Sequence, residues 1–156
     1  MGDELEVGPP FGDVVLEDGD DPLVLVSAGI GVTPAAAMLD HLAAVQPERE
    51  VLFLHADRSP VVHALREQVA ASLGRMPRAH AVTWYEKPGG VRGGGVLEGR
   101  IDVGALPVPL PAKARAYLCG PIPFMRGVRR GLLAAGVGEE RIRYEVFGPD
   151  LWNQAD

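Results

Sequence analysis

Cysteine is almost absent from this chain, and its absence narrows the chemistry available. Cys119 is the single cysteine among 156 residues, so no internal disulfide can form and no CxxC pair is present for zinc or an iron–sulfur cluster. The four histidines show no metal-ligand spacing, and we expect no metal site. Any redox chemistry must therefore use an organic cofactor.

Long apolar runs, a signal peptide and an excess of positive charge are also lacking. No apolar run approaches the roughly 20 residues that cross a bilayer. The acidic stretch from Met1 to Glu4 differs from the basic and apolar start of a signal peptide. The formal net charge of −6 disfavours binding to a phosphate backbone. We expect a cytoplasmic protein with one main core and no nucleic-acid or membrane partner.

The sequence does contain short apolar runs that alternate with segments of helical period. This alternation predicts an α/β fold, a doubly wound parallel sheet with helices on both faces, in three layers. Residues 87–111 are rich in Gly and Pro and predict a long surface connection. Residues 1–21 differ in kind, and we expect a strand pair from 5–7 and 14–16. The expected strands of the main sheet are 22–27, 51–56, 79–85, 114–119 and 143–147, and the expected helices are 34–46, 61–73 and 123–135.

A glycine turn, residues 27–34, directly follows the first of these strands. A strand that ends in Gly-x-Gly before a helix brings backbone N–H groups and a helix N-terminus to the carboxyl edge of the sheet, where an anion is stabilised. Gly29 and Gly31 would let a pyrophosphate approach without a Cβ in the way. Thr33 suits the N-cap and Pro34 the first helical turn. A tight turn that binds nothing remains an alternative, because Pro34 replaces the third glycine of the familiar fingerprint.

A second glycine turn, Cys119-Gly120-Pro121, also separates an apolar strand from a helix. In an open α/β sheet, ligands bind where the strand order reverses, so two such turns at that crevice would enclose one dinucleotide. Taken alone, Cys119 is equally consistent with a small, inert, buried residue.

Together with residues 55–60, 82–86, 117–121 and 144–149, these turns resemble the pyridine-nucleotide domain of the ferredoxin-NADP reductase superfamily. The resemblance is greatest to the C-terminal reductase part of bacterial flavohaemoglobins, which are nitric oxide dioxygenases, and it runs from about residue 2 to the C-terminus. It implies a five-stranded sheet of order 3-2-1-4-5 that binds NAD(P)H and delivers hydride to FAD.

The resemblance also implies roles for individual residues. It places the pyrophosphate on Gly29, Ile30, Gly31, Val32 and Thr33, followed by Pro34, and the nicotinamide near Cys119, Gly120 and Pro121. Phe147 would lie beside the flavin ring, unless it is an ordinary apolar plug at a strand end, and Glu145 would help to orient the reacting rings.

The adenosine end of such a site is less sharply defined. Asp57 ends the second strand, where a carboxylate can bind the ribose 2′-hydroxyl and repel a 2′-phosphate. Arg58 follows it and could attract that phosphate, and the two residues could also form a solvated surface pair. On balance NADH is favoured over NADPH.

The same resemblance shows which parts of the parent protein are missing from this sequence. Only 8–13 matches the flavin-binding β-barrel, so we interpret 1–21 as a remnant of that barrel and 22–156 as the NAD(P)-binding domain. FAD would be held mainly by the absent barrel and haem by an absent globin domain, and these domains are the expected partners. We expect the isolated chain to be inactive without an FAD domain. The alternatives are the nucleotide domain of an oxygenase reductase and a non-catalytic nucleotide-binding or docking module.

Overall fold

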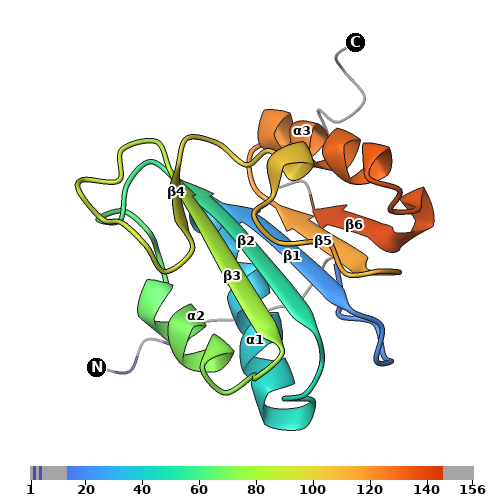
Figure 1. The fold of residues 1–156 in the computed structure, drawn as a ribbon. Coiled ribbons are helices and arrows are strands. Elements are labelled where there is room, and N and C mark those ends of the chain that lie inside the picture. Colours follow the sequence, from blue (N-terminus) through green and yellow to red (C-terminus); the bar gives the residue numbers. More distant parts are fainter. Residues whose placement is uncertain (1, 3, 5–13, 146–156) are drawn as a thin grey trace.

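The computed structural model describes residues 2, 4 and 14–145 (Figure 1). The predictions for Phe147, for residues 5–7 and for the barrel segment 8–13 lie outside these residues. The strands are β1 (Leu23–Ala28), β2 (Val51–Asp57), β3 (Ala79–Tyr85), β4 (Val96–Glu98), β5 (Arg115–Cys119) and β6 (Ile142–Glu145). The helices are α1 (Val32–Val45), α2 (Arg66–Leu73) and α3 (Ile122–Ala134), with short 3-10 turns η1 (Gly29–Gly31), η2 (Val103–Ala105) and η3 (Glu139–Arg141).

The strands form one sheet in the order β4-β3-β2-β1-β5-β6, and every neighbouring pair is parallel. The five strands other than β4 follow the predicted order 3-2-1-4-5, which confirms the doubly wound α/β fold. β4 is an additional edge strand that pairs Val96 with Thr83. It lies within 87–111, the predicted long surface connection, so the sheet has six strands where five were expected. Gly95 explains the close pairing, because a Cβ on it would lie 2.5 Å from the Ala81 carbonyl oxygen.

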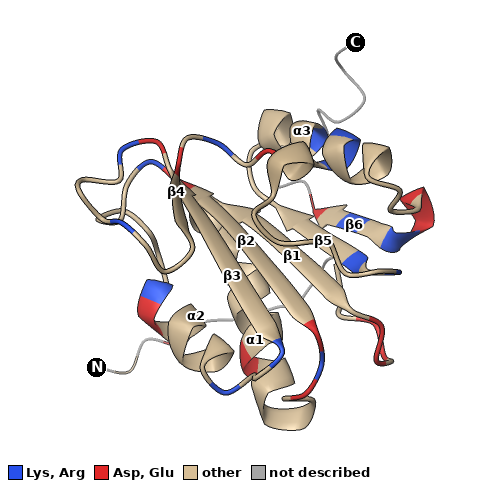
Figure 2. Ribbon diagram, viewed as in Figure 1, with Lys and Arg blue, Asp and Glu red and all other residues tan. Residues whose placement is uncertain are grey.

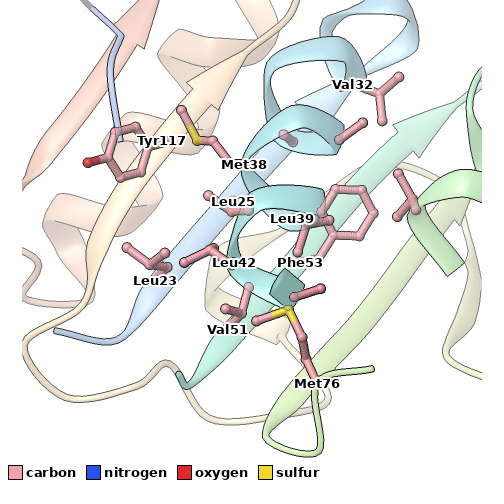
Figure 3. Packing of buried hydrophobic residues seen from close by; sticks show 14 residues of the cluster. Leu23, Leu25, Val32, Met38, Leu39, Leu42, Val51, Phe53, Met76 and Tyr117 are labelled. Atoms are coloured by element: carbon pink, nitrogen blue, oxygen red, sulfur yellow. The ribbon is translucent and has the colours of Figure 1, made fainter. Parts of the chain in front are cut away.

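Helices cover both faces of the sheet, which gives the three predicted layers (Figure 1). On one face, apolar side chains of β1 and β2 pack beneath α1, where Leu39 and Leu42 are buried (Figure 3). On the other face, alternate residues of the same strands, such as Val24 and Val26, pack beneath α3 with Met125. The central strands are therefore buried on both sides, which explains their continuous apolar runs.

Two predicted elements differ from the structure. The helix predicted over 61–73 begins only at Arg66. Leu65, the residue before it, has a left-handed backbone (φ 56°), and a right-handed helix cannot continue through such a residue. Residues 14–16, predicted as half of a strand pair, are not in a strand. Val14 and Leu16 instead pack against the α1 side of the core, so their apolar character serves burial and not strand pairing.

Charged residues lie mainly on loops and at the ends of helices and strands (Figure 2). One group of ion pairs joins the segment 14–22 to the end of the sheet. Glu17 pairs with Arg115 and Arg143, and Asp21 pairs with Arg115 and Arg141. Within the described part of the chain, no helix has both the length and the apolarity that crossing a bilayer would require.

Candidate functional site

A pocket of about 650 Å³ opens at the carboxyl edge of the sheet. It lies next to β1, whose neighbours are β2 on one side and β5 on the other, so it occupies the point where the strand order reverses. Its size is typical of a small-molecule or cofactor site. The lining residues come from the ends of β1 and β2, the start of α3 and the segment after β4: Ala28, Gly29, Ile30, Ala56, Asp57, Arg58, Val62, Glu86, Gly99, Arg100, Ile101, Pro121, Pro123, Phe124, Gly127 and Val128.

The first glycine turn supplies one wall of the pocket. Gly29 has a left-handed backbone (φ 53°), and a Cβ added to it would meet no atom within 4 Å, so the space beside it is open to a ligand. The side chain of Ile30 is 73% exposed. Gly31 has a different environment, since a Cβ there would lie 2.5 Å from the carbonyl oxygen of Cys119. The space that we expected Gly31 to leave for a pyrophosphate is therefore filled by the protein backbone.

The N-terminus of α1 lies directly behind this turn. The N-cap is Gly31, and no side chain caps the helix. The prediction that Thr33 is the N-cap was wrong: Thr33 is the second residue of α1, and its Oγ1 donates to the Ile30 carbonyl at 3.3 Å. Pro34 lies in the first turn, as predicted. The first turn of α1 therefore has no side-chain acceptor. The Val32 N–H already donates to the carbonyl oxygens of Gly29 and Ile30 and Pro34 has no N–H, so only the other N–H groups of this turn are available to a bound anion.

The second glycine turn packs against the first. Gly120 has no spare space, because a Cβ on it would lie 2.9 Å from Phe124 Cδ1 and 3.1 Å from Ala28 Cβ. Cys119 is buried, and burial together with the nearby charge of Glu145 raises the pKa of its thiol to about 11. Glu145 is the strand partner of Cys119 on β6. The thiol is therefore protonated at neutral pH and is not a nucleophile in this state.

Asp57 and Arg58 lie at the end of β2 and both line the pocket. The Asp57 side chain is only 6% exposed: Oδ1 accepts a hydrogen bond from the Arg58 N–H at 2.7 Å, and Oδ2 lies 3.6 Å from His55 Nε2. Arg58 is exposed. The pair is thus not a solvated surface pair, because the carboxylate points into the protein while the arginine lies at the surface.

Sequence reasoning missed the opposite wall. Glu86 follows β3 and forms an ion pair with Arg100, with 3.4 Å between Oε1 and Nε. Glu86 could have been found from its place after a strand, since ligands collect at the carboxyl ends of parallel strands. Arg100 lies in the irregular segment after β4, and no pattern in the sequence marks it.

A buried polar cluster beside the pocket was also missed. Ser27 Oγ lies 2.8 Å from His55 Nδ1, and His63 Nδ1 lies 2.7 Å from the Tyr85 hydroxyl. The two imidazole rings stack with centroids 4.0 Å apart. Burial, with a smaller contribution from His63, lowers the pKa of His55 to about 4. Over residues 14–145, no three His, Cys, Asp or Glu side chains are grouped so that they could hold a metal ion.

Comparison with known proteins bears on these features. The family model of the oxidoreductase NAD-binding domain matches residues 25–130. The flavohemoprotein of Bordetella pertussis is 44% identical over 153 residues, covering 94% of this chain and 38% of that protein. This chain therefore spans well under half of the length of such relatives.

Two solved structures are similar in both sequence and fold. The flavohem-like FAD/NAD-binding domain of nitric oxide dioxygenase from Vibrio cholerae has a TM-score of 0.77 and 37% identity, covering 88% of this chain and 56% of that one. The flavohemoglobin from Malassezia yamatoensis, with bound FAD and heme, has a TM-score of 0.76 and 37% identity, covering 88% of this chain and 36% of that one. This chain belongs to the oxidoreductase NAD-binding domain family.

Proposed function

We propose that this chain binds NAD(P)H and passes its hydride to FAD, as the nucleotide module of a flavohaemoglobin nitric oxide dioxygenase. The observation that carries the proposal is the pocket at the reversal of strand order, bordered by the turn at Gly29 and by Pro121 after the second turn. The similarity of 37% and more to flavohemoproteins supports the choice of parent protein.

The proposed coenzyme lies across the carboxyl edge of the sheet. The pyrophosphate rests on the backbone from Gly29 to Thr33, at the N-terminus of α1, because uncapped N–H groups and open space meet there. The nicotinamide extends toward Cys119, Gly120 and Pro121. The adenosine extends toward Asp57 and Arg58, beside β2.

NAD(P)H supplies a hydride and FAD accepts it, so the protein acts by position and electrostatics. Cys119 contributes a small, uncharged side chain, because its raised pKa keeps the thiol protonated. Glu145, paired with Cys119 across β5 and β6, lies at the same edge and is proposed to help orient the rings. Phe147 is proposed to lie beside the flavin and stays a prediction outside the described residues.

The acceptor side of the reaction requires further protein. Hydride transfer needs the two rings about 3–3.5 Å apart and held together. We propose that an FAD-binding barrel supplies the flavin and that a globin domain supplies the haem, with all three acting in the cytoplasm. The chain alone should then oxidise NADH poorly even though its nucleotide site is intact.

We propose NADH as the preferred coenzyme, although the rim of the pocket is close to balanced in charge. The carboxylates of Asp57 and Glu86 oppose a 2′-phosphate, whereas Arg58 and Arg100 attract one. The preference rests on Asp57, which ends β2 and lines the pocket, and whose inward-pointing carboxylate would have to turn outward to accept a hydrogen bond from a ribose hydroxyl.

The test compares NADH oxidation in two mixtures. The purified chain is mixed with FAD, NADH and ferricyanide, and the assay is repeated with a separately produced FAD-binding barrel from a flavohaemoglobin. Turnover only in the second mixture supports the proposal. NADH binding without turnover in either mixture would favour a non-catalytic module. A third mixture contains the FAD-binding barrel of an oxygenase reductase instead, and turnover only there would favour that second class of parent protein.

A further inference from the structure

We propose that His63 is a positioning residue for the adenosine half of the coenzyme site. Through Tyr85 and His55, it fixes the segment 58–65, which forms the wall of the pocket beyond β2. This inference rests on the proposed binding of NAD(P)H and names residues that control one half of it.

The segment 58–65 contributes Arg58 and Val62 to the pocket but has little regular structure of its own. No residue of it lies in a helix or strand. Its larger apolar side chains do not anchor it, since Val61 is 93% exposed and Val62 and Leu65 are also exposed, and among them only the small Ala64 packs against the core. Its position must therefore depend on the few side chains that point inward.

His63 is the inward-pointing polar side chain of this segment. Its Nδ1 lies 2.7 Å from the hydroxyl of Tyr85, which is buried at the end of β3. Its ring stacks on that of His55, with 4.0 Å between centroids and 21° between planes. One loop residue is thus held by two neighbouring strands of the sheet.

The two anchors are themselves fixed. His55 is held by the hydrogen bond between its Nδ1 and Ser27 Oγ, and its ring lies parallel to that of Phe53. Ser27 is the first residue of the first glycine turn. One buried cluster therefore links the segment 58–65, the end of β2 and the first glycine turn. His63 is the member of this cluster that does not lie on a strand of the sheet.

A strained backbone position lies close to His63 along the chain. Leu65, two residues further on, has the left-handed backbone that side chains rarely adopt. Such a conformation persists only where the surrounding structure enforces it. When the contacts of His63 are lost, the part of the segment beyond Arg58 should relax, and Val62 should leave its place in the wall. The backbone of Arg58 should stay, because the Lys87 N–H donates to its carbonyl oxygen at 2.8 Å. The first glycine turn, after β1, and the second glycine turn, after β5, should keep their positions.

The test measures the affinity of the chain for 5′-AMP and for NADH by calorimetric titration. His63→Phe keeps an aromatic ring to stack on His55 and removes the hydrogen bond, and Tyr85→Phe removes the same bond from the other side. We expect each variant to raise the Kd of both ligands by about 2- to 10-fold, the range that the loss of one hydrogen bond produces. The Kd should rise by the same factor for 5′-AMP and for NADH, because both ligands contain the adenosine.

Two further measurements separate positioning from general destabilisation. The double variant His63→Phe/Tyr85→Phe should bind the two ligands no more weakly than either single variant does, because the two substitutions remove the same hydrogen bond. Hydrogen exchange should rise in 58–65 but not in α1. His80→Ala is the control, since it removes an exposed histidine at the other end of β3. It should change neither the Kd values nor the hydrogen exchange of 58–65. Unaltered Kd values for 5′-AMP and NADH in Tyr85→Phe and His63→Phe would overturn the inference, whereas a wild-type chain that binds neither ligand would overturn the proposed function itself.

Discussion

Gly31 and Cys119 are in direct backbone contact, which joins the two glycine turns of the site into one unit. A Cβ on Gly31 would lie 2.5 Å from the carbonyl oxygen of Cys119 and 2.8 Å from the amide nitrogen of Gly120. Neither atom can move without displacing the end of β5. The glycine is therefore required by packing between β1 and β5, on which the shape of the pocket depends.

Gly31→Ala should destabilise the fold, because the added methyl group has no space. We expect the free energy of unfolding to fall by about 1–3 kcal/mol, the usual cost of overpacking. Denaturation by urea measures it. Gly127→Ala is the control: Gly127 lies within α3, and a Cβ there would meet no atom within 4 Å. That variant should be as stable as the wild type or more stable, and equal losses in both would contradict the packing role of Gly31.

Gly29→Ala should weaken NADH binding while the fold persists. The new Cβ would enter the open space where the pyrophosphate is proposed to lie and would keep the phosphate from the backbone N–H groups. We expect the Kd for NADH to rise by about 10-fold or more, which is the effect of losing one hydrogen bond to a charged group. Gly94→Ala is a matched control, since Gly94 has a similar backbone (φ 59°), equally open space and no place in the pocket lining. If both variants bind NADH as the wild type does, the pyrophosphate does not lie at Gly29.

The contrast between Gly29 and Gly31 shows how far the sequence could predict the site. Gly-x-Gly between a strand and a helix was enough to locate the turn, because local backbone geometry determines it. Which glycine faces a ligand and which faces Cys119 depends on contacts between β1 and β5, which no local pattern records. The same holds for His63 and Tyr85, which meet only in the folded chain.

The parallel sheet was predictable because its central strands do leave a local pattern in the sequence. Each long central strand is an unbroken apolar run, since both of its faces are buried, so β1 and β2 were found nearly to the residue. β4 has three residues and a single close approach at Gly95, and its pairing with β3 leaves no periodic signal. The left-handed backbone of Leu65 likewise delays the start of α2 to Arg66, and no glycine stands at that position to mark it.

Protonation of His55 should make the fold less stable in acid. Burial lowers its folded-state pKa from 6.5 to about 4, so between these values the unfolded chain binds a proton that the folded chain does not. The contribution of His55 to stability should be complete above pH 6.5, should fall as the pH drops toward 4, and should then stay constant. A shift of this size corresponds to about 3 kcal/mol, and the pKa of His63 is lowered in the same direction.

The measurement is the free energy of unfolding between pH 7.5 and about 4. His55→Asn lacks the titrating group but keeps an acceptor near Ser27, so its stability at neutral pH should be lower while its dependence on pH is weaker. His41→Ala removes an exposed histidine and serves as the control. An equally steep dependence in His55→Asn and the wild type would show that other groups cause the acid sensitivity.

Arg115→Met should loosen the segment 14–22. Arg115 pairs with both Glu17 and Asp21, and its hydrogen bond to Asp21 is the main cause that lowers the pKa of that carboxyl. We expect faster cleavage of the segment in limited proteolysis, with the rest of the domain resistant. High salt should have a similar effect on the wild type. Arg78→Met, which removes an exposed pair with Glu50, is the control, and identical cleavage rates would contradict the role of Arg115.

The central claim is that NAD(P)H binds along the carboxyl edge of this sheet, and the amide NMR spectrum of the labelled chain with and without NADH tests it most directly. We expect saturable shifts at residues 28–33, 57–58 and 119–121, with the amino ends of the same strands unchanged. The absence of saturable shifts, or shifts confined to residues away from these three turns, would contradict it.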